Sequence, residues 1–278
     1  MSDKKLVSVN ITTYNRANLL SKCLESVLKQ SYPNLEVVIV NDCSTDNTEK
    51  IIKDYQQNDK RIKYYKHNIN KGNAAARNTA LKYSAGFYVA FLDDDDEWID
   101  KDKLKKQVVI FENSKNNNLG IICSGILRHK GSGEGIIQKA LHPKDIKYEV
   151  LKGGLIHNST VLTKRSIMEK VGGFDLKVSR GVDSEFFRRL IVIFNYSVFF
   201  MDDITCKYFE NSPHSMSGTY TADGCIGKIN SQYINIKKYF WFLLIRPKIL
   251  FLRLYILINM QIKYLLLLLK NNYRKKIY

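Results

Sequence analysis

The sequence predicts an α/β protein built around a mostly parallel central sheet, and three observations support that prediction. Short apolar runs alternate with amphipathic stretches over about the first hundred residues, which is the pattern of strands alternating with helices in a doubly wound sheet. The run Glu36–Val40 is rich in β-branched residues, as buried parallel strands are. Polar clusters follow three of the runs, where ligands bind in open α/β sheets. A chain of 278 residues suffices for one large domain with an appendage.

The individual elements follow from periodicity and turn signals. Strands are predicted over residues 6–11, 36–40, 62–66, 87–92, 120–124 and 156–162. Helices are predicted over residues 18–29, 46–58, 72–84 and 98–113. Asp46, with Glu49 three residues later, resembles a capping box at the start of the second helix. The glycine-rich stretch 128–135 is expected to form a loop.

A run of four aspartates, Asp93–Asp96, directly follows the fourth predicted strand. Like charges this close repel, and no cation in the neighbouring sequence offsets them. A divalent metal would neutralise the run, because Mg²⁺, Mn²⁺ and Ca²⁺ prefer hard oxygen ligands. The alternative is a solvated acidic turn.

Two further polar clusters follow the first and second strands, at residues 12–16 and 41–46. Asparagine, aspartate, serine and threonine also favour turns, so each cluster alone is compatible with ordinary loop chemistry. Three clusters at one sheet edge instead indicate a shared nucleotide site.

Four ordered segments resemble the family 2 glycosyltransferases, which have the GT-A fold. They are VNITTYNR at 9–16, VNDCSTD at 40–46, NKGNAAARN at 70–78 and AFLDDDD at 90–96. The resemblance covers about residues 5–215. It implies a GT-A domain over residues 1–222. The remaining residues, 223–278, lie outside the resemblance, and their composition predicts a helical basic and apolar tail.

The resemblance implies a donor site for a nucleotide-sugar. The residues implied to hold the nucleoside are Thr12, Thr13, Tyr14 and Arg16. Asp42 would accept a hydrogen bond from a uracil ring. The two groups match because uracil N3–H is a donor and a carboxylate can only accept. Arg77 would lie near the donor and the aspartates. The alternatives are a turn cap for Asp42 and a surface helix arginine for Arg77.

The resemblance also implies a metal, Mn²⁺ or Mg²⁺, held by a DxD motif at Asp93-Asp94-Asp95. Asp95 would ligate a metal that bridges the donor diphosphate, while Asp93 would reach the ribose or a metal-bound water. The run of four leaves the register open by one residue, so Asp94 and Asp96 remain candidates. His214 would complete the metal or diphosphate site, with a structural histidine as the alternative.

The segment 181–190 resembles the acidic segment in which the family places its catalytic base. Asp183 occupies that position, although Val182 stands where the family has an acid. A carboxylate at a helix start is also a good N-cap, and Glu185 is a second candidate for the base. The resemblance implies one displacement that inverts the anomeric centre.

The formal net charge of +17 is concentrated in the tail, because no Asp or Glu follows Asp223. The tail's apolar runs, residues 239–245 and 265–269, are interrupted by lysines and arginines that can extend towards an interface. This composition indicates an anionic membrane surface, with packing on the domain or a second subunit as the alternative. No stretch of 18 uncharged apolar residues occurs, so no spanning helix is expected.

The localisation expected is cytoplasmic, on the inner face of the cell membrane. The N-terminus lacks the apolar core of a signal peptide. The sequence has five cysteines, an odd number, and no CxxC pair. This cysteine content favours a protein of a reducing compartment.

The function predicted is an inverting, metal-dependent glycosyltransferase. It would move a sugar from a nucleotide donor, a UDP-sugar, to a glycan or lipid-linked acceptor in bacterial surface polysaccharide or glycoconjugate synthesis. A sugar nucleotidyltransferase is one alternative, but residues 12–16 lack the glycine-rich basic loop it would need. A nucleic-acid-binding protein is another, which the leucine-rich tail and the lack of a base-reading motif disfavour, so no nucleic acid is expected as a partner.

Overall fold

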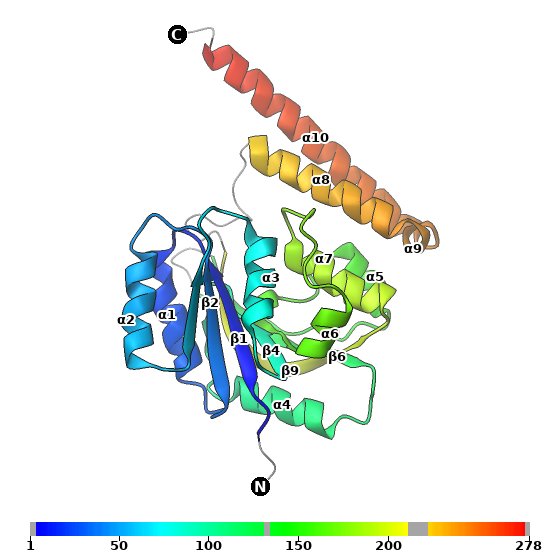
Figure 1. The fold of residues 1–278 in the computed structure, drawn as a ribbon. Coiled ribbons are helices and arrows are strands. Elements are labelled where there is room, and N and C mark those ends of the chain that lie inside the picture. The colour runs from blue at the N-terminus through cyan, green and yellow to red at the C-terminus, as the bar shows by residue number, and fades with distance from the viewer. Residues whose placement is uncertain (1–3, 131–133, 211–221, 276–278) are drawn as a thin grey trace.

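The computed structural model describes residues 4–130, 134–210 and 222–275, and its centre is one large sheet flanked by helices (Figure 1). Among the described residues the strand order is β3-β2-β1-β4-β8-β6-β9-β5, with β7 paired to β6. The strands are β1 (Val7–Thr13), β2 (Leu35–Asn41), β3 (Ile62–Lys66), β4 (Tyr88–Phe91), β5 (Glu97–Trp98), β6 (Leu119–Lys130), β7 (Ile136–Gln138), β8 (Leu162–Lys164) and β9 (Ser197–Glu210). The helices are α1 (Ala17–Leu28), α2 (Thr48–Asn58), α3 (Asn73–Tyr83), α4 (Lys103–Asn113), α5 (Ile146–Lys152), α6 (Arg165–Lys170), α7 (Val182–Arg188), α8 (Ala222–Lys238), α9 (Phe240–Leu244) and α10 (Pro247–Lys275), with single turns η1 (Asn158–Thr160) and η2 (Arg189–Ile193).

The predicted α/β class with a mostly parallel sheet is confirmed. β1 pairs in parallel with both β2 and β4, and β2 pairs in parallel with β3. The carboxyl ends of β1, β2 and β4 therefore lie at one edge of the sheet, where the three polar clusters were expected to meet. β6 and β9 are also parallel, and the antiparallel pairs involve β5, β7 and β8.

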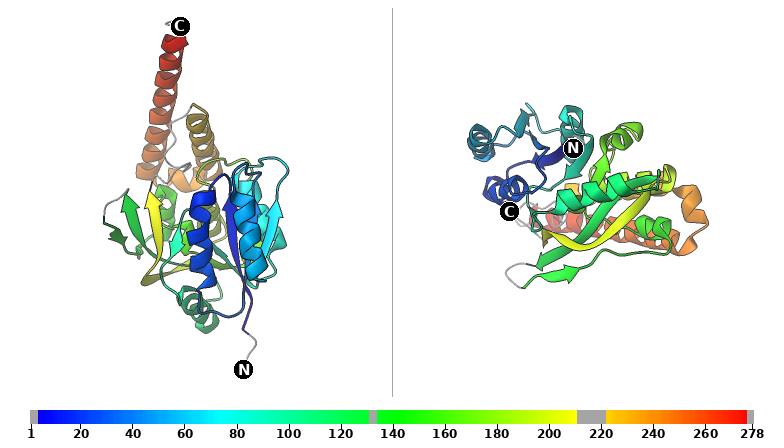
Figure 2. Two further views of the ribbon diagram at one scale, coloured as in Figure 1. Left: turned by 90° about the vertical axis from the view of Figure 1, so that its left-hand side faces the viewer. Right: turned by 90° about the horizontal axis from the view of Figure 1, so that it is seen from below.

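Alternation along the strands divides the core into two faces. In β4, Tyr88 and Ala90 pack with the apolar residues of α1 and α4, while Val89 and Phe91 pack with those of α6 and α7. α1, α2 and α4 thus cover one face, and α3, α6 and α7 cover the other (Figures 1 and 2). Each fully buried aliphatic or aromatic side chain contributes about 1.5–3 kcal/mol to folding.

Three predicted elements were wrong in their bounds or type. The helix predicted over 98–113 begins only at Lys103, because Glu97 and Trp98 pair with β9 as a short strand. Much of the strand predicted over 156–162 is the turn η1, with β8 following it. The loop predicted from 128 begins later, since β6 continues to Lys130.

The capping box predicted at Asp46 and Glu49 does not form. Helix α2 begins at Thr48, whose backbone N–H donates to Asp46 Oδ1 at 3.0 Å. Glu49 instead forms ion pairs with Lys53 and Lys66. Asp46 also accepts from the backbone N–H of Ala17 at 3.0 Å, so it ties α2 to the start of α1.

The tail forms helices that lie against the preceding fold. α8 and α10 run side by side over one end of the molecule (Figures 1 and 2). Lys238 in α8 forms ion pairs with Asp175 at 2.8 Å and with Glu185 at 2.7 Å. In α10, Arg253 Nε donates to Leu151 O at 2.9 Å. The division of the chain at residue 222 stays a prediction, but the helices after it contact the domain directly.

Helix α10 bears on the expectation that no helix spans a membrane. Its residues 247–267 are long and apolar enough to cross a membrane by length and composition alone, and 11% of the apolar window is buried. The sequence analysis required 18 uncharged apolar residues in a row. A test that tolerates a few basic residues within the helix includes α10.

Candidate active site

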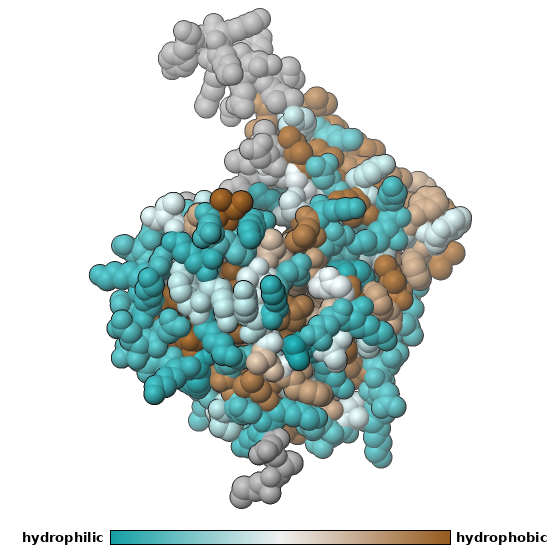
Figure 3. Space-filling view, viewed as in Figure 1, coloured by the Kyte–Doolittle hydropathy of each residue, from teal (hydrophilic) through white to brown (hydrophobic). Residues whose placement is uncertain are grey.

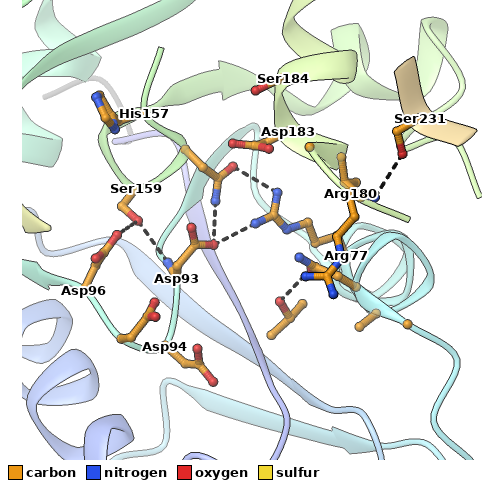
Figure 4. A pocket seen from close by; sticks show the side chains of 18 of the residues that line it. Arg77, Asp93, Asp94, Asp96, His157, Ser159, Arg180, Asp183, Ser184 and Ser231 are labelled. Carbon is orange, nitrogen blue, oxygen red and sulfur yellow. Dashed lines mark hydrogen bonds and ion pairs between the residues drawn. The ribbon is translucent and has the colours of Figure 1, made fainter. Parts of the chain in front are cut away.

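One cavity of about 870 Å³ joins the three polar clusters (Figure 4). It is lined by residues 12–16 at the end of β1 and just after it, by Asp42 after β2 and by Asp93–Asp96 after β4. Arg77 of α3 and Asp183 of α7 also line it. The sequence predicted this gathering correctly.

The aspartate cluster is neutralised in part by two arginines that are distant in sequence. Arg16 Nη1 lies 2.6 Å from Asp94 Oδ1 and 2.9 Å from Asp95 Oδ2. Arg77, itself 6% exposed, places Nη2 2.7 Å from Asp93 Oδ1. The absence of a nearby cation in the sequence was therefore misleading, because the fold supplies both. The surface-arginine alternative for Arg77 is wrong.

The two arginines do not fully offset the burial and mutual repulsion of these carboxylates. Burial raises the pKa of Asp94 to about 6, against the opposing effect of Arg16. Burial, with the charges of Asp93 and Asp95, raises the pKa of Asp96 well above its usual value. Asp94 Oδ2 and Asp96 Oδ1 are buried without a hydrogen-bond partner among the described residues. The solvated-turn alternative is wrong, because Asp94 and Asp96 are only 3% and 2% exposed.

These carboxylates fit a hard divalent cation such as Mn²⁺ or Mg²⁺ in chemistry and charge. Within the described ranges, no group of three His, Cys, Asp or Glu side chains could hold a metal by itself. Further ligands for a cation would come from outside the described residues, and the oxygens of a diphosphate could be among them. The metal and its assignment to Asp95 stay predictions, and His214 lies outside the described residues.

Asp42 holds the turn that leads into α3. Its Oδ1 accepts from Lys71 N at 2.9 Å and its Oδ2 from Gly72 N at 2.8 Å. His67 Nδ1 lies 2.7 Å from Oδ1 and carries the proton, because a carboxylate only accepts. A carboxylate offers about four lone-pair sites, so Asp42 keeps one for a ligand in the cavity. The turn-holding and base-reading roles are therefore compatible.

His67 is a candidate site residue that the sequence reasoning missed. Its Nε2 lies 2.9 Å from Thr79 Oγ1 of α3, so both ring nitrogens are held and the ring fixes Asp42. His67 directly follows β3. A polar residue at the same sheet edge as the other clusters was the signal that could have found it.

The loops after β1 and β2 hold each other. Asn15 adopts a left-handed conformation, with φ of 53°. Its backbone N–H donates to Ser44 Oγ at 2.9 Å, and its Oδ1 accepts from Thr45 N at 2.7 Å. Thr12 Oγ1 lies 3.4 Å from Asn73 Oδ1, and Tyr14 is 45% exposed. The region predicted to bind a nucleoside is therefore pre-formed and open to a ligand.

Asp183 is the second residue of α7 and lines the cavity (Figure 4). The helix is capped by Gly181, with φ of 65°, so the N-cap alternative for Asp183 is wrong. Among the described residues no hydrogen bond or ion pair involves its carboxylate. Burial, together with the charges of Asp95 and Asp183, raises the pKa of Asp93 against the opposing effect of Arg77.

Glu185, the second candidate for the base, has a structural environment. It is fully buried, forms ion pairs with Lys238 at 2.7 Å and Arg189 at 3.2 Å, and does not line the cavity. The geometry therefore favours Asp183.

The turn η1 and the residue before it add three cavity residues, which the sequence analysis had assigned to a strand. Asn158 Nδ2 donates to Asp93 Oδ1 at 2.9 Å. Ser159 Oγ donates to Asp96 Oδ2 at 2.5 Å and accepts from Asp93 N at 3.1 Å. Burial lowers the pKa of His157, which also lines the cavity.

The tail helices form a further wall of the cavity, which the sequence did not predict. The lining residues from α8 and α10 are Lys228, Ser231, Gln232, Asn235, Arg253 and Met260. Arg180 and Arg188 flank them from α7 and the segment before it. The tail is thus part of the candidate site.

Comparisons with known proteins identify the family of this chain. The family model Glycosyl transferase family 2 matches residues 8–172. The chain belongs to glycosyl transferase family 2. The predicted class of enzyme, a glycosyltransferase, is confirmed by this membership, and neither a nucleotidyltransferase nor a nucleic-acid-binding protein is supported.

Two similar relatives are bacterial. The chain is 38% identical over 164 residues to the "Putative teichuronic acid biosynthesis glycosyltransferase TuaG" of Bacillus subtilis, covering 58% of this chain and 63% of that one. It is 37% identical over 167 residues to the "UDP-Glc:alpha-D-GlcNAc-diphosphoundecaprenol beta-1,3-glucosyltransferase WfgD" of Escherichia coli, covering 60% and 63%. The chain thus matches just under two thirds of the length of each.

Solved structures confirm the GT-A fold. Staphylococcus aureus TarS 1–349 in complex with UDP-GlcNAc matches with a TM-score of 0.64 and 22% identity, over 83% of this chain and 66% of that one. The mannosyltransferase PcManGT from Pyrobaculum calidifontis, in complex with GDP-Man and Mn²⁺, matches with a TM-score of 0.63 and 21% identity, over 85% and 65%.

Proposed function

We propose that the protein is an inverting, metal-dependent glycosyltransferase that moves a sugar from a UDP-sugar to a glycan or lipid-linked acceptor. The observation that carries the proposal is one cavity that joins Asp42, the aspartate cluster and Asp183. Each has a distinct chemical task in a single displacement.

The donor half of the reaction uses the sheet edge. Asp42 keeps a free lone-pair site for uracil N3–H, and the preference for UDP follows from that contact. Asp95, with Asp93, Asp94 or Asp96, would hold Mn²⁺ or Mg²⁺, which supplies positive charge against the leaving nucleoside diphosphate. Arg77 would stabilise the same developing charge from α3.

The acceptor half uses Asp183. Its carboxylate takes the proton of the acceptor hydroxyl as general base. The hydroxyl oxygen forms a bond to the anomeric carbon while the bond from that carbon to the diphosphate oxygen breaks. The electron pair of that bond leaves with the nucleoside diphosphate. Attack from the opposite face inverts the centre, and no second carboxylate is needed as an acid.

The printed functions of the relatives support the biological setting. WfgD is named for UDP-glucose as donor and a diphosphoundecaprenol-linked sugar as acceptor, and TuaG for teichuronic acid biosynthesis. By analogy, this protein acts in bacterial surface polysaccharide or glycoconjugate synthesis.

We further propose that the tail holds the enzyme at the inner face of the cell membrane. Large apolar side chains are exposed on α9, α10 and the turn between them, among them Trp241 (77% exposed), Ile245 (73%) and Phe251 (70%). Figure 3 shows brown, apolar residues gathered along the tail helices. Lysines and arginines without any following acid favour an anionic leaflet. A second copy of the chain is the competing partner for this apolar surface.

Donor turnover tests the reaction. The purified protein would be incubated with UDP-, GDP- and dTDP-sugars and Mn²⁺, with and without EDTA, beside the variant Asp95→Ala. We expect slow release of UDP from one donor, abolished by EDTA and by the substitution. Calorimetric binding of each donor with Mn²⁺ covers the case in which turnover requires an acceptor. Failure to bind any nucleotide-sugar in the presence of metal would overturn the proposal.

A further inference from the structure

The cavity has two walls of opposite charge. The acids that line it come from the ends of β2 and β4 and from Asp183, whereas the lining residues of α8 and α10 include cations and no acid. Arg16 and Arg77 are ion-paired with the aspartate cluster. The remaining arginines and lysine that line the cavity form what we call the basic wall, which consists of Arg180, Arg188, Lys228 and Arg253.

Two members of the basic wall are buried and bonded to neutral groups. Arg188 is 4% exposed, its Nη2 donates to Asn235 Oδ1 at 3.3 Å, and its Nε has no hydrogen-bond partner among the described residues. Arg253 is 5% exposed and donates to Leu151 O at 2.9 Å and to Gln232 Oε1 at 2.9 Å. Buried cations are costly unless they are paired with an anion. The charges of Glu185 and Asp183 act on Arg188, but its hydrogen bond and those of Arg253 go to neutral groups. These two buried arginines therefore favour an anion at this side of the cavity.

In Figure 4, Asp183 lies between Arg180 of the basic wall and the aspartate cluster. Figure 4 shows Asp93, Asp94 and Asp96 on one side of the pocket, and Arg180 and Ser231 on the other. The backbone N–H of Arg180 donates to Ser231 Oγ at 3.2 Å, which joins the segment before α7 to α8. In the proposed function the donor diphosphate lies on the aspartate side, so an anion on the far side of Asp183 would belong to the acceptor.

We propose that the basic wall binds the diphosphate of a lipid-linked saccharide acceptor. This inference rests on the proposed function, because it assigns the acceptor of the same reaction. Guanidinium and ammonium groups are the side chains that bind phosphate oxygens most strongly.

Helix α10 favours a lipid-linked diphosphate over a free one. Arg253 and Met260 of α10 line the cavity, while Phe251, Tyr255 and Ile258 of the same helix are 70%, 64% and 53% exposed. A lipid chain attached to a diphosphate at Arg253 would leave along the apolar side of α10. One helix would then hold both the membrane and the headgroup.

Equilibrium binding without donor or metal tests the inference. Calorimetry would compare undecyl diphosphate, undecyl β-glucoside and inorganic pyrophosphate on the full chain. We expect undecyl diphosphate to bind at least tenfold more tightly than either comparison ligand. The double variant Arg180→Gln, Lys228→Gln should weaken that binding by roughly tenfold to a hundredfold, the loss expected for charge-assisted hydrogen bonds. Both side chains are partly exposed, so folding should be retained, as circular dichroism would verify.

The matched control is Lys237→Gln, which removes an exposed lysine of α8 outside the cavity and should leave binding unchanged. Saturating UDP with Mn²⁺ should not displace undecyl diphosphate. Competition by UDP, equal binding of the glucoside, or unchanged binding by the double variant would each overturn the proposal. Equal affinity for pyrophosphate would overturn the assignment to a lipid-linked acceptor. Because neither donor nor turnover enters this measurement, a failure of the proposed function would be detected separately, by the donor panel.

Discussion

Arg77 of α3 and Asp93 after β4 form an ion pair with 2.7 Å between Nη2 and Oδ1, and Asn158 of η1 bonds to both. Three separate elements therefore meet at one carboxylate of the candidate site. Arg77 is buried, and its guanidinium also lies over the ring of Phe174 at 5.4 Å. Its position is thus fixed by packing as well as by charge.

Replacing Arg77 should impair transfer more than donor binding. The substitution Arg77→Lys keeps a charge but loses the planar fork, and we expect kcat to fall by about a hundredfold, as for loss of one preorganised donor to developing charge. Steady-state kinetics would measure it, with the exposed Arg165→Lys as control. A change confined to the KM of the donor would contradict a role in stabilising the leaving group.

Asp42 and His67 should act together in selecting the base of the nucleotide. Asp42→Asn replaces an acceptor with a group that can also donate, and we expect UDP to bind about tenfold more weakly, from the loss of one hydrogen bond to a charged group. His67→Ala should weaken the binding of UDP by a smaller factor, because this substitution only allows the Asp42 carboxylate to move. Calorimetric titration of UDP against GDP would measure both, with His142→Ala, an exposed histidine, as control. Unchanged preference for UDP in Asp42→Asn would contradict the assignment.

Lys103 should make folding stability depend on pH. Burial lowers its pKa to about 7, while in the unfolded chain it is about 10.4. Between these values the unfolded state holds a proton that the native state has lost, so the free energy of unfolding rises with pH from about 7 to about 10. Lys103→Met removes this slope and should raise stability at pH 6 by roughly 2–4 kcal/mol, after allowance for the lost bond to Gln107.

Denaturant unfolding at pH 6 to 10 would test this prediction. Lys101→Met, at an exposed position before the same helix, is the control and should keep the wild-type slope. The same slope in Lys103→Met as in the wild type would show that the lysine is not responsible.

The parallel half of the fold could be predicted because its signals are local. Each apolar run in β1, β2 and β4 ends in a polar cluster, and the adjacency of these strands places the clusters together. The site residues Asp42 and Asp183 follow from segments that resemble the family. These contacts require only the order of the strands and the direction of the chain.

The rest of the site depends on contacts between distant residues, which periodicity does not encode. Trp98 lies in a strand because its backbone pairs with Cys206 of β9, and its Nε1 donates to Ser159 O at 2.7 Å, 61 residues away. The pairing of Arg16 with Asp94 spans 78 residues. The role of the tail as a cavity wall requires Arg253 to reach Leu151, which no composition of the tail could indicate.

The apolar surface of the tail should bind membranes rather than stabilise the fold. The double variant Trp241→Glu, Ile245→Glu changes two side chains that are more than 70% exposed, so the melting temperature should change little. Co-sedimentation with vesicles of anionic phospholipid should fall at least tenfold, from lost apolar burial and added repulsion.

The control for the tail is Ile136→Glu, which alters an exposed apolar residue of β7. If the Trp241→Glu, Ile245→Glu variant still binds vesicles but shifts from dimer to monomer in analytical ultracentrifugation, the apolar surface of the tail binds a second copy of the chain.

The most direct test of the proposed mechanism is the variant Asp183→Asn, with transfer and donor binding measured on the same preparation. The amide keeps the shape of the side chain but cannot accept the acceptor's proton. We predict that Mn²⁺-dependent binding of the UDP-sugar stays within about twofold of wild type, while kcat falls by roughly a thousandfold, within the range for loss of a general base. Transfer within tenfold of wild type would contradict the account and place the base elsewhere in the cavity.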